Sequence, residues 1–76
     1  MPLIRGKMKM RDEKRIFPFM NEIATLWQTS FPDWRFGQVM TVFENWVKVN
    51  TSYNDLFYIE EDRFLELFKE FCEVIG

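Results

Sequence analysis

Apolar side chains recur at helical spacing along three segments of the chain. In the first segment, about Lys14 to Gln28, the residues Ile16, Met20, Ile23 and Trp27 follow at steps of four, three and four. That spacing puts them on one face of a helix. The second segment is predicted at about Trp34 to Val49, and its apolar face consists of Phe36, Val39, Met40, Phe43, Trp46 and Val47. The third segment is predicted from Glu60 or Glu61 to Val74, and its apolar face consists of Phe64, Leu67, Phe68, Phe71 and Ile75.

Prolines constrain the ends of the first helix. Pro18 lacks an N–H and fits a helix only in its first turn, so the helix is predicted to begin near Arg15 to Phe17 after a lead-in turn over residues 12–14. A kink at Pro18 is the alternative. The sequence Phe31-Pro32 is predicted to end this helix, because a residue that precedes proline disfavours helical backbone angles.

The second helix is predicted to begin after Asp33, whose side chain suits an N-cap. Gly37 then falls inside the helix, where glycine costs about 1 kcal/mol relative to alanine. We interpret this glycine as the point where the helix packs closely against its neighbour. The short connection over residues 31–33 predicts that the first two helices pack antiparallel.

The segment between the second and third helices is rich in turn-forming residues. Residues 50–54 are predicted to form the main loop, and Asp55 to Tyr58 either a single helical turn or a short extended piece. If Glu60 caps the third helix, Ile59 and Phe64 occupy the two positions of a hydrophobic staple. The acidic first turn suits the positive end of the helix dipole.

Together these patterns predict an all-α fold: a small bundle of three principal helices with a short extra turn before the last. A chain of 76 residues has room for one domain, which we place at residues 10–76. Residues 1–9 have no apolar period and contain Pro2 and Gly6, so they are predicted to form a flexible arm. The 47% apolar and 18% aromatic composition excludes disorder for most of the chain.

Charge is distributed unevenly along the chain. Residues 1–15 carry six basic and two acidic groups, whereas the remaining residues carry four basic and ten acidic groups, which gives +4 and −6. A basic arm on an acidic body is one interpretation, and a solvated tail is the other. The basic residues of the arm that could contact nucleic acid are Arg5, Lys7, Lys9 and Arg11.

The composition argues against catalysis. The chain has no histidine, which is the commonest general base near neutral pH, and Cys72 has no base near it in sequence. No catalytic, metal-binding or cofactor-binding residues are predicted. A single cysteine excludes an internal disulfide and favours a reducing, cytoplasmic location, and no apolar run is long enough for a membrane span.

Two surfaces remain as candidate binding sites. Seven aromatic residues lie outside the three main stripes, more than a small bundle buries easily, and exposed apolar patches mark interfaces. Around the start of the second helix, tryptophan and arginine are residue types favoured at binding hot spots. The predicted partner-binding residues are Phe31, Trp34, Arg35 and Gln38, and an acidic docking stripe is predicted along the third helix at Asp62, Glu66, Glu70 and Glu73.

The strings "RDEKRI", "PDWRFGQ" and "DLFYIEEDRFLEL" carry a resemblance. They resemble small uncharacterised proteins of Gram-positive bacteria and their phages, and the layout is more distantly similar to the YihD-like family of unknown function. The similarity spans about Met10 to Phe71, with Glu61 where those proteins have aspartate. It implies a cytoplasmic helical protein encoded by a phage or prophage, and it brings no catalytic residues.

The predicted function is therefore non-catalytic protein–protein interaction, either as a homodimer or as a small regulator or inhibitor of a host protein. The alternative is association with nucleic acid through the basic arm. The acidic body opposes this alternative, because it would repel a phosphate backbone.

Overall fold

The computed structural model describes residues 12–76 of the chain. This part folds into three α-helices, and it contains no strand. The helices are α1 (Ile16–Ser30), α2 (Phe36–Asn50) and α3 (Glu61–Ile75), and a 3-10 turn, η2 (Glu13–Arg15), precedes α1. The predicted all-α bundle is confirmed. The arm predicted at residues 1–9 lies outside the described residues.

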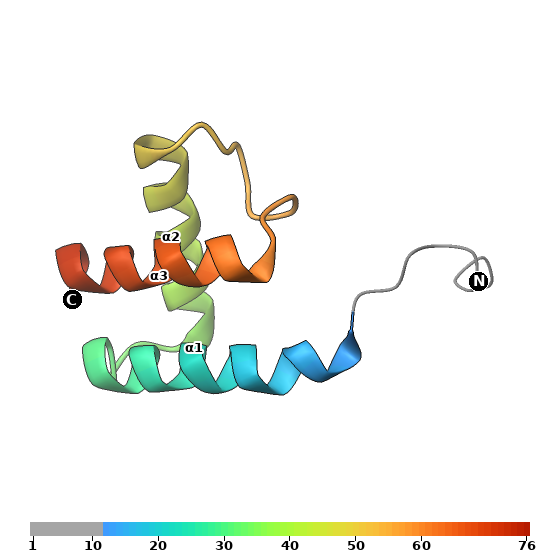
Figure 1. Cartoon of the computed structure of the whole chain (residues 1–76). Coiled ribbons are helices and arrows are strands. Elements are labelled where there is room, and N and C mark those ends of the chain that lie inside the picture. Colours follow the sequence, from blue (N-terminus) through green and yellow to red (C-terminus); the bar gives the residue numbers. More distant parts are fainter. Residues whose placement is uncertain (1–11) are drawn as a thin grey trace.

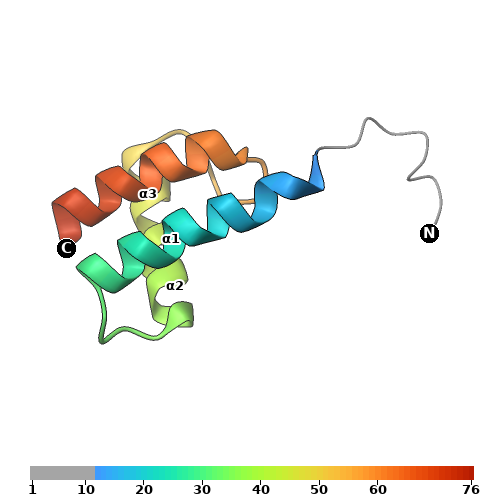
Figure 2. The ribbon, with the colours of Figure 1, turned by 60° about the horizontal axis from the view of Figure 1, so that its bottom comes forward.

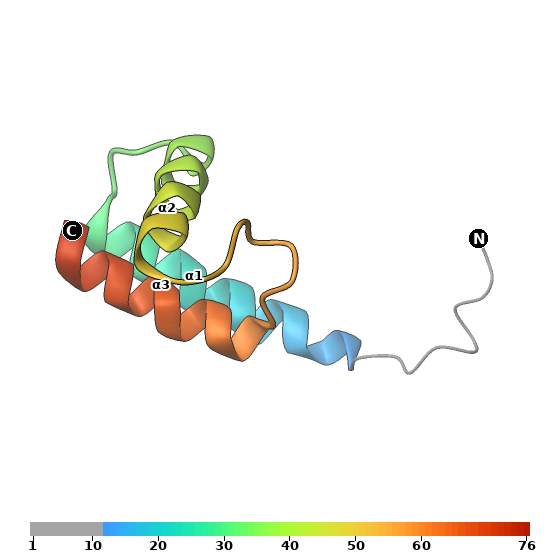
Figure 3. The same cartoon turned by 90° about the horizontal axis from the view of Figure 1, so that it is seen from above.

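Helices α1 and α3 lie side by side and run in the same direction, while α2 runs across one face of the pair (Figures 1, 2 and 3). Contacts at both ends define the parallel pair. At the helix starts, Arg15 Nε lies 3.0 Å from Glu61 Oε1. At the helix ends, a Cβ placed on Gly76 would come within 2.9 Å of Ser30 Cβ.

The predicted antiparallel pairing of the first two helices is therefore wrong. The segment between α1 and α2 covers residues 31–35, which is long enough to turn the chain across α1 rather than back along it. Residue Phe31 in this segment is buried against Phe71 of α3, with ring centroids 5.3 Å apart. The buried Phe31 ring holds the connecting segment against α3. Helix α1 therefore packs along α3 rather than along α2.

The core is built around Phe43 of α2, whose side chain is fully buried. Its ring centroid lies 5.0 Å from those of Phe64 and Phe68 and 5.3 Å from that of Phe71, all on α3. Edge-to-face and tilted contacts of this kind add about 0.5–1.5 kcal/mol each beyond the burial of apolar area. Helix α1 closes the core with Ile23, which is 3% exposed.

The start of α1 agrees with the late start predicted from Pro18. The proline lies in the first turn of the helix, where its missing N–H leaves no hydrogen bond unmade. The lead-in turn is η2, and its N-cap is Asp12, whose Oδ1 accepts a 2.9 Å hydrogen bond from the Lys14 N–H.

The start of α2 differs from the prediction. The N-cap is Arg35 rather than Asp33, and the Gln38 side chain accepts a 2.8 Å hydrogen bond from the Arg35 N–H. Asp33 instead lies in a turn that closes when the Trp34 N–H donates to the Phe31 carbonyl at 3.0 Å. The Trp34 carbonyl accepts from the Trp27 indole N–H, also at 3.0 Å, and this contact holds residue 34 outside the helix.

Gly37 does not mark a close packing contact, so that prediction is also wrong. No atom lies within 4 Å of the position that a Cβ would occupy, apart from the local backbone. Its φ is not positive either. Gly37 instead lies in the first turn of α2, where it is exposed to solvent.

Candidate functional site

Three aromatic side chains are exposed almost completely. Phe17 is 78% exposed, Phe57 is 80% exposed and Tyr58 is 78% exposed. Phe57 and Tyr58 line a groove together with Arg15 and Glu61, the two residues that join the starts of α1 and α3. Phe17 follows Arg15 by two residues on α1, and residues two apart on a helix do not share a face. We call Phe57 and Tyr58 the aromatic end.

A tight turn before α3 displays two of these rings. The Phe57 N–H donates to Asp55 Oδ1 at 2.9 Å, and the Ile59 N–H donates to the Leu56 carbonyl at 3.3 Å. Leu56 and Ile59 pack against the core, and Ile59 is buried. Because both flanking residues point inward, Phe57 and Tyr58 between them face solvent, with ring centroids 4.7 Å apart.

This segment resolves the two alternatives left open for residues 55–58. It is a hydrogen-bonded turn with an aspartate cap, so it is neither a helical turn nor an extended piece. The third helix then begins at Glu61 with Glu60 as N-cap, as the staple pattern requires. Ile59 is buried and Phe64 packs against the core, which agrees with their staple positions.

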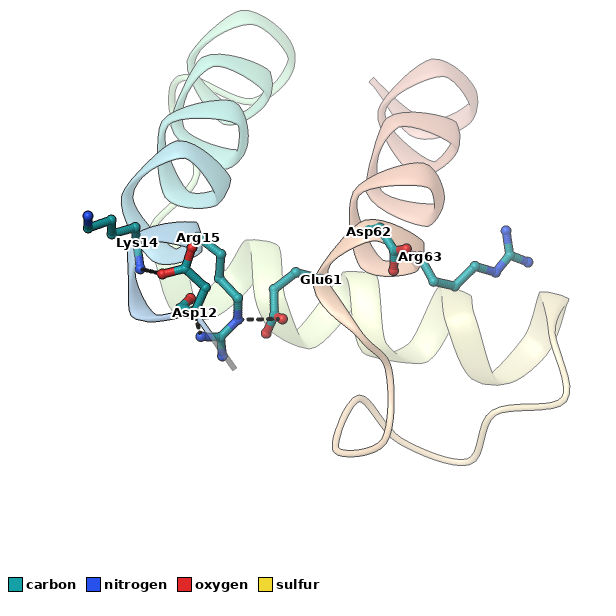
Figure 4. Close-up of polar contacts among 6 residues, drawn as sticks. All are labelled: Asp12, Lys14, Arg15, Glu61, Asp62 and Arg63. Atoms are coloured by element: carbon teal, nitrogen blue, oxygen red, sulfur yellow. Dashed lines mark hydrogen bonds and ion pairs between the residues drawn. The ribbon is translucent and has the colours of Figure 1, made fainter. Parts of the chain in front are cut away.

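A surface groove adjoins the two rings and is predominantly acidic. One part is lined by Phe57 and Tyr58 together with Arg15, Ile59, Glu60 and Glu61. The neighbouring part, which we call the end groove, is lined by Asp12, Arg15, Glu60, Glu61 and Asp62. Figure 4 shows Arg15 reaching from the start of α1 to Glu61, while Arg63 points away from this contact. The residues that line the end groove include four carboxylates and one guanidinium, whose formal charges sum to −3.

The four partner-binding residues predicted around Trp34 differ in how far they are exposed to solvent. Phe31 is only 4% exposed, so the prediction that it contacts a partner is wrong. Its side chain belongs to the core. Trp34 is half-buried, with its ring centroid 4.5 Å from that of Phe31. Arg35 and Gln38 are exposed, and Gln38 is engaged as part of the helix cap. A shallow groove beside them is lined by Trp34, Gly37, Gln38, Thr41 and Val42.

The acidic stripe predicted on α3 is a solvent-facing surface. All four of its residues, Asp62, Glu66, Glu70 and Glu73, are exposed. Glu66 accepts a 2.8 Å hydrogen bond from Arg63, and this contact raises the pKa of the guanidinium above its ordinary value. The stripe meets the end groove at Asp62, which is one of the residues that line this groove.

Within residues 12–76, no group of His, Cys, Asp and Glu side chains is arranged to hold a metal ion. Cys72 is buried, and its burial raises the pKa of the thiol, although a hydrogen bond with Ser30 acts in the opposite direction. A raised pKa leaves less reactive thiolate at neutral pH. The same part of the chain contains no helix that is long and apolar enough to cross a membrane.

Sequence patterns identified the surplus of aromatic residues but did not select the aromatic end. The basic residues Arg5, Lys7, Lys9 and Arg11 lie outside the described residues. The signal that was available is local: Asp55 begins a turn, and Leu56 and Ile59 enclose the pair Phe57-Tyr58. Two apolar anchors around two rings predict that the rings point away from the core.

Comparisons with known proteins return no matching family model, no matching curated protein and no matching solved structure. The resemblance to small Gram-positive and phage proteins therefore stays a prediction.

Proposed function

We propose that this protein is a non-catalytic module that binds another protein through its aromatic end. The observation that carries the proposal is the exposure of Phe57 and Tyr58 beside one groove, in a small domain that buries most of its other large rings wholly or in part. Removing a Phe side chain from water contributes about 1.5–3 kcal/mol. A partner that covers these rings would gain that contribution.

The surroundings of the rings indicate the chemistry of the partner. The formal charges of the residues that line the end groove sum to −3, which is larger than the charge of about +0.5 at the positive end of the α3 dipole. Complementary charge steers association and selects among partners. We therefore propose a partner segment that carries lysine or arginine beside apolar side chains. The same charge opposes a nucleic-acid backbone at this end.

The resemblance adds a biological setting to this proposal. We propose that the partner is a protein of the host cell and that the chain regulates or inhibits it by occupying a surface. Binding alone suffices for such a role, so it places no demand on the missing histidine or on the buried Cys72 thiol.

Affinity capture with matched variants tests the proposal. The unaltered protein, a Phe57→Ser/Tyr58→Ser variant and a Val49→Ser control are each immobilised, and captured proteins are quantified by mass spectrometry. Val49 is 81% exposed in the last turn of α2 and lines neither part of the groove, so its substitution removes apolar surface without changing the aromatic end. We expect to find a partner protein that is captured by the unaltered protein and by the Val49→Ser control but not by the double variant. Its binding should be reproduced when the partner is purified.

Equal capture by the double variant and the unaltered protein would reject the aromatic end. In that case the surface around Trp34 becomes the candidate. Its test is Arg35→Ala combined with Thr41→Asp, two exposed positions in and beside the shallow groove.

A further inference from the structure

The end groove lies where residues 1–11 join the described fold. Asp12, the first described residue, is one of the residues that line it. The eleven preceding residues contain the basic residues Arg5, Lys7, Lys9 and Arg11 and no carboxylate. The apolar residues Leu3 and Ile4 precede these positive charges, and Met8 and Met10 alternate with them. This segment therefore has the mixture of positive and apolar side chains that the aromatic end and its groove would bind.

We propose that residues 1–11 are an internal ligand of the aromatic end, which they occupy until a partner displaces them. The inference rests on the proposed function, since it assigns the first occupant of the same binding surface. Charge complementarity supports it: the segment carries four positive groups, and residues 12–76 carry twelve acidic against six basic groups. The effect is autoinhibitory, because any partner has to compete with a tethered segment.

Chain length and tethering permit this contact. Eleven residues span up to about 36–40 Å when extended, so the basic side chains can reach both the end groove and the rings beyond it. A segment tethered by a short linker has an effective concentration in the millimolar range. A segment whose free peptide binds with a Kd of about 0.1 mM would then occupy its site about 90% of the time.

Chemical shifts of the full chain provide the first test. Backbone amide signals of residues 57–62 are compared at low salt and at about 0.5 M salt, where charge interactions between exposed groups are strongly screened. We expect salt to move these signals in the unaltered chain and to move them much less in a variant with Arg5, Lys7, Lys9 and Arg11 all changed to Gln. A control that changes Arg35, Lys48 and Lys69 to Gln should behave like the unaltered chain.

Competition provides the second test. The probe is a labelled synthetic peptide with the sequence of residues 1–11, added to the unaltered chain and to the variant with four Gln substitutions. We expect the variant to bind the peptide about tenfold more tightly, because its own segment no longer competes. Equal affinities, or salt-dependent shifts that the four substitutions do not change, would overturn the inference. Shifts that depend on protein concentration would also overturn it, because they would place the contact between two copies.

These outcomes are separable from the test of the proposed function. Capture of a partner that requires Phe57 and Tyr58, without any competition by residues 1–11, would reject the internal ligand alone. Peptide binding at the aromatic end, without any captured partner, would reject the proposed function and leave the internal ligand standing.

Discussion

Phe43 and Phe57 are the same residue type in opposite environments. The Phe43 side chain is fully buried against three rings of α3, whereas Phe57 is 80% exposed on the turn that precedes that helix. The difference comes from backbone position. Phe43 lies at the centre of the inward-facing stripe of α2, and Phe57 lies between two residues that are themselves turned inward.

This contrast shows that burial within the domain does not account for all of its aromatic residues. A small domain has little stability to give up, since typical values are about 5–15 kcal/mol and the smallest domains bury the least surface. Leaving the rings of Phe57 and Tyr58 in water forgoes several kcal/mol of burial, at about 1.5–3 kcal/mol each. Such a loss is expected where the rings serve a surface that another segment covers.

The largest expected effect separates the two regions directly. Phe43→Ala should lower the free energy of unfolding by about 3–5 kcal/mol, because it leaves a cavity among three rings. Phe57→Ala should change it by no more than about 0.5 kcal/mol, as an exposed substitution does. Urea unfolding followed by tryptophan fluorescence measures both. If Phe43→Ala does not fold, Phe43→Leu gives an intermediate value. Similar decreases in the free energy of unfolding for Phe43→Ala and Phe57→Ala would contradict the contrast between a buried and an exposed ring.

The next effect tests how the rings are held outward. Ile59→Ala should cost about 2–4 kcal/mol, because Ile59 is buried and anchors the turn that carries Phe57 and Tyr58. It should also weaken partner binding, since the rings lose their fixed position. The matched control is Val49→Ala, at an exposed site, which should leave both quantities nearly unchanged. Full partner binding by the Ile59 variant would show that the turn does not position the rings.

A smaller effect of opposite sign is expected at the open start of α2. Gly37→Ala should raise the free energy of unfolding by about 0.5–1 kcal/mol. An added methyl group meets no atom within 4 Å, and alanine restricts the unfolded chain. Thermal unfolding measures the change. A decrease in Tm would restore the idea of a close contact at Gly37.

The smallest expected effect concerns the contact between the starts of α1 and α3. A double-mutant cycle with Arg15→Ala and Glu61→Ala should give a coupling energy of about 0.2–1 kcal/mol, because both side chains are more than a third exposed. About 0.5 M salt should reduce the coupling further. A coupling above about 2 kcal/mol would show that this end of the molecule is held far more rigidly than its exposure indicates.

Much of the local structure follows from sequence alone. Apolar spacing located all three helices, and Pro18 placed the start of α1 correctly because the steric restriction on proline is local. The start of α2 was misplaced because the contact that decides it is not local: the Trp27 indole N–H binds the Trp34 carbonyl across the connection. The aromatic surplus was evident from composition. Which rings remain exposed was not, and Phe31 was assigned to the surface although it is buried.

The sequence by itself determined the three amphipathic helices and the uneven charge, because both depend only on the order of residues along the chain. The tertiary structure decided that α1 pairs in parallel with α3 and that α2 lies across them. It also decided that Phe57 and Tyr58 lie exposed beside the acidic end groove. Helix pairing depends on which apolar faces fill one another best, and that is a property of the packed molecule rather than of any single segment.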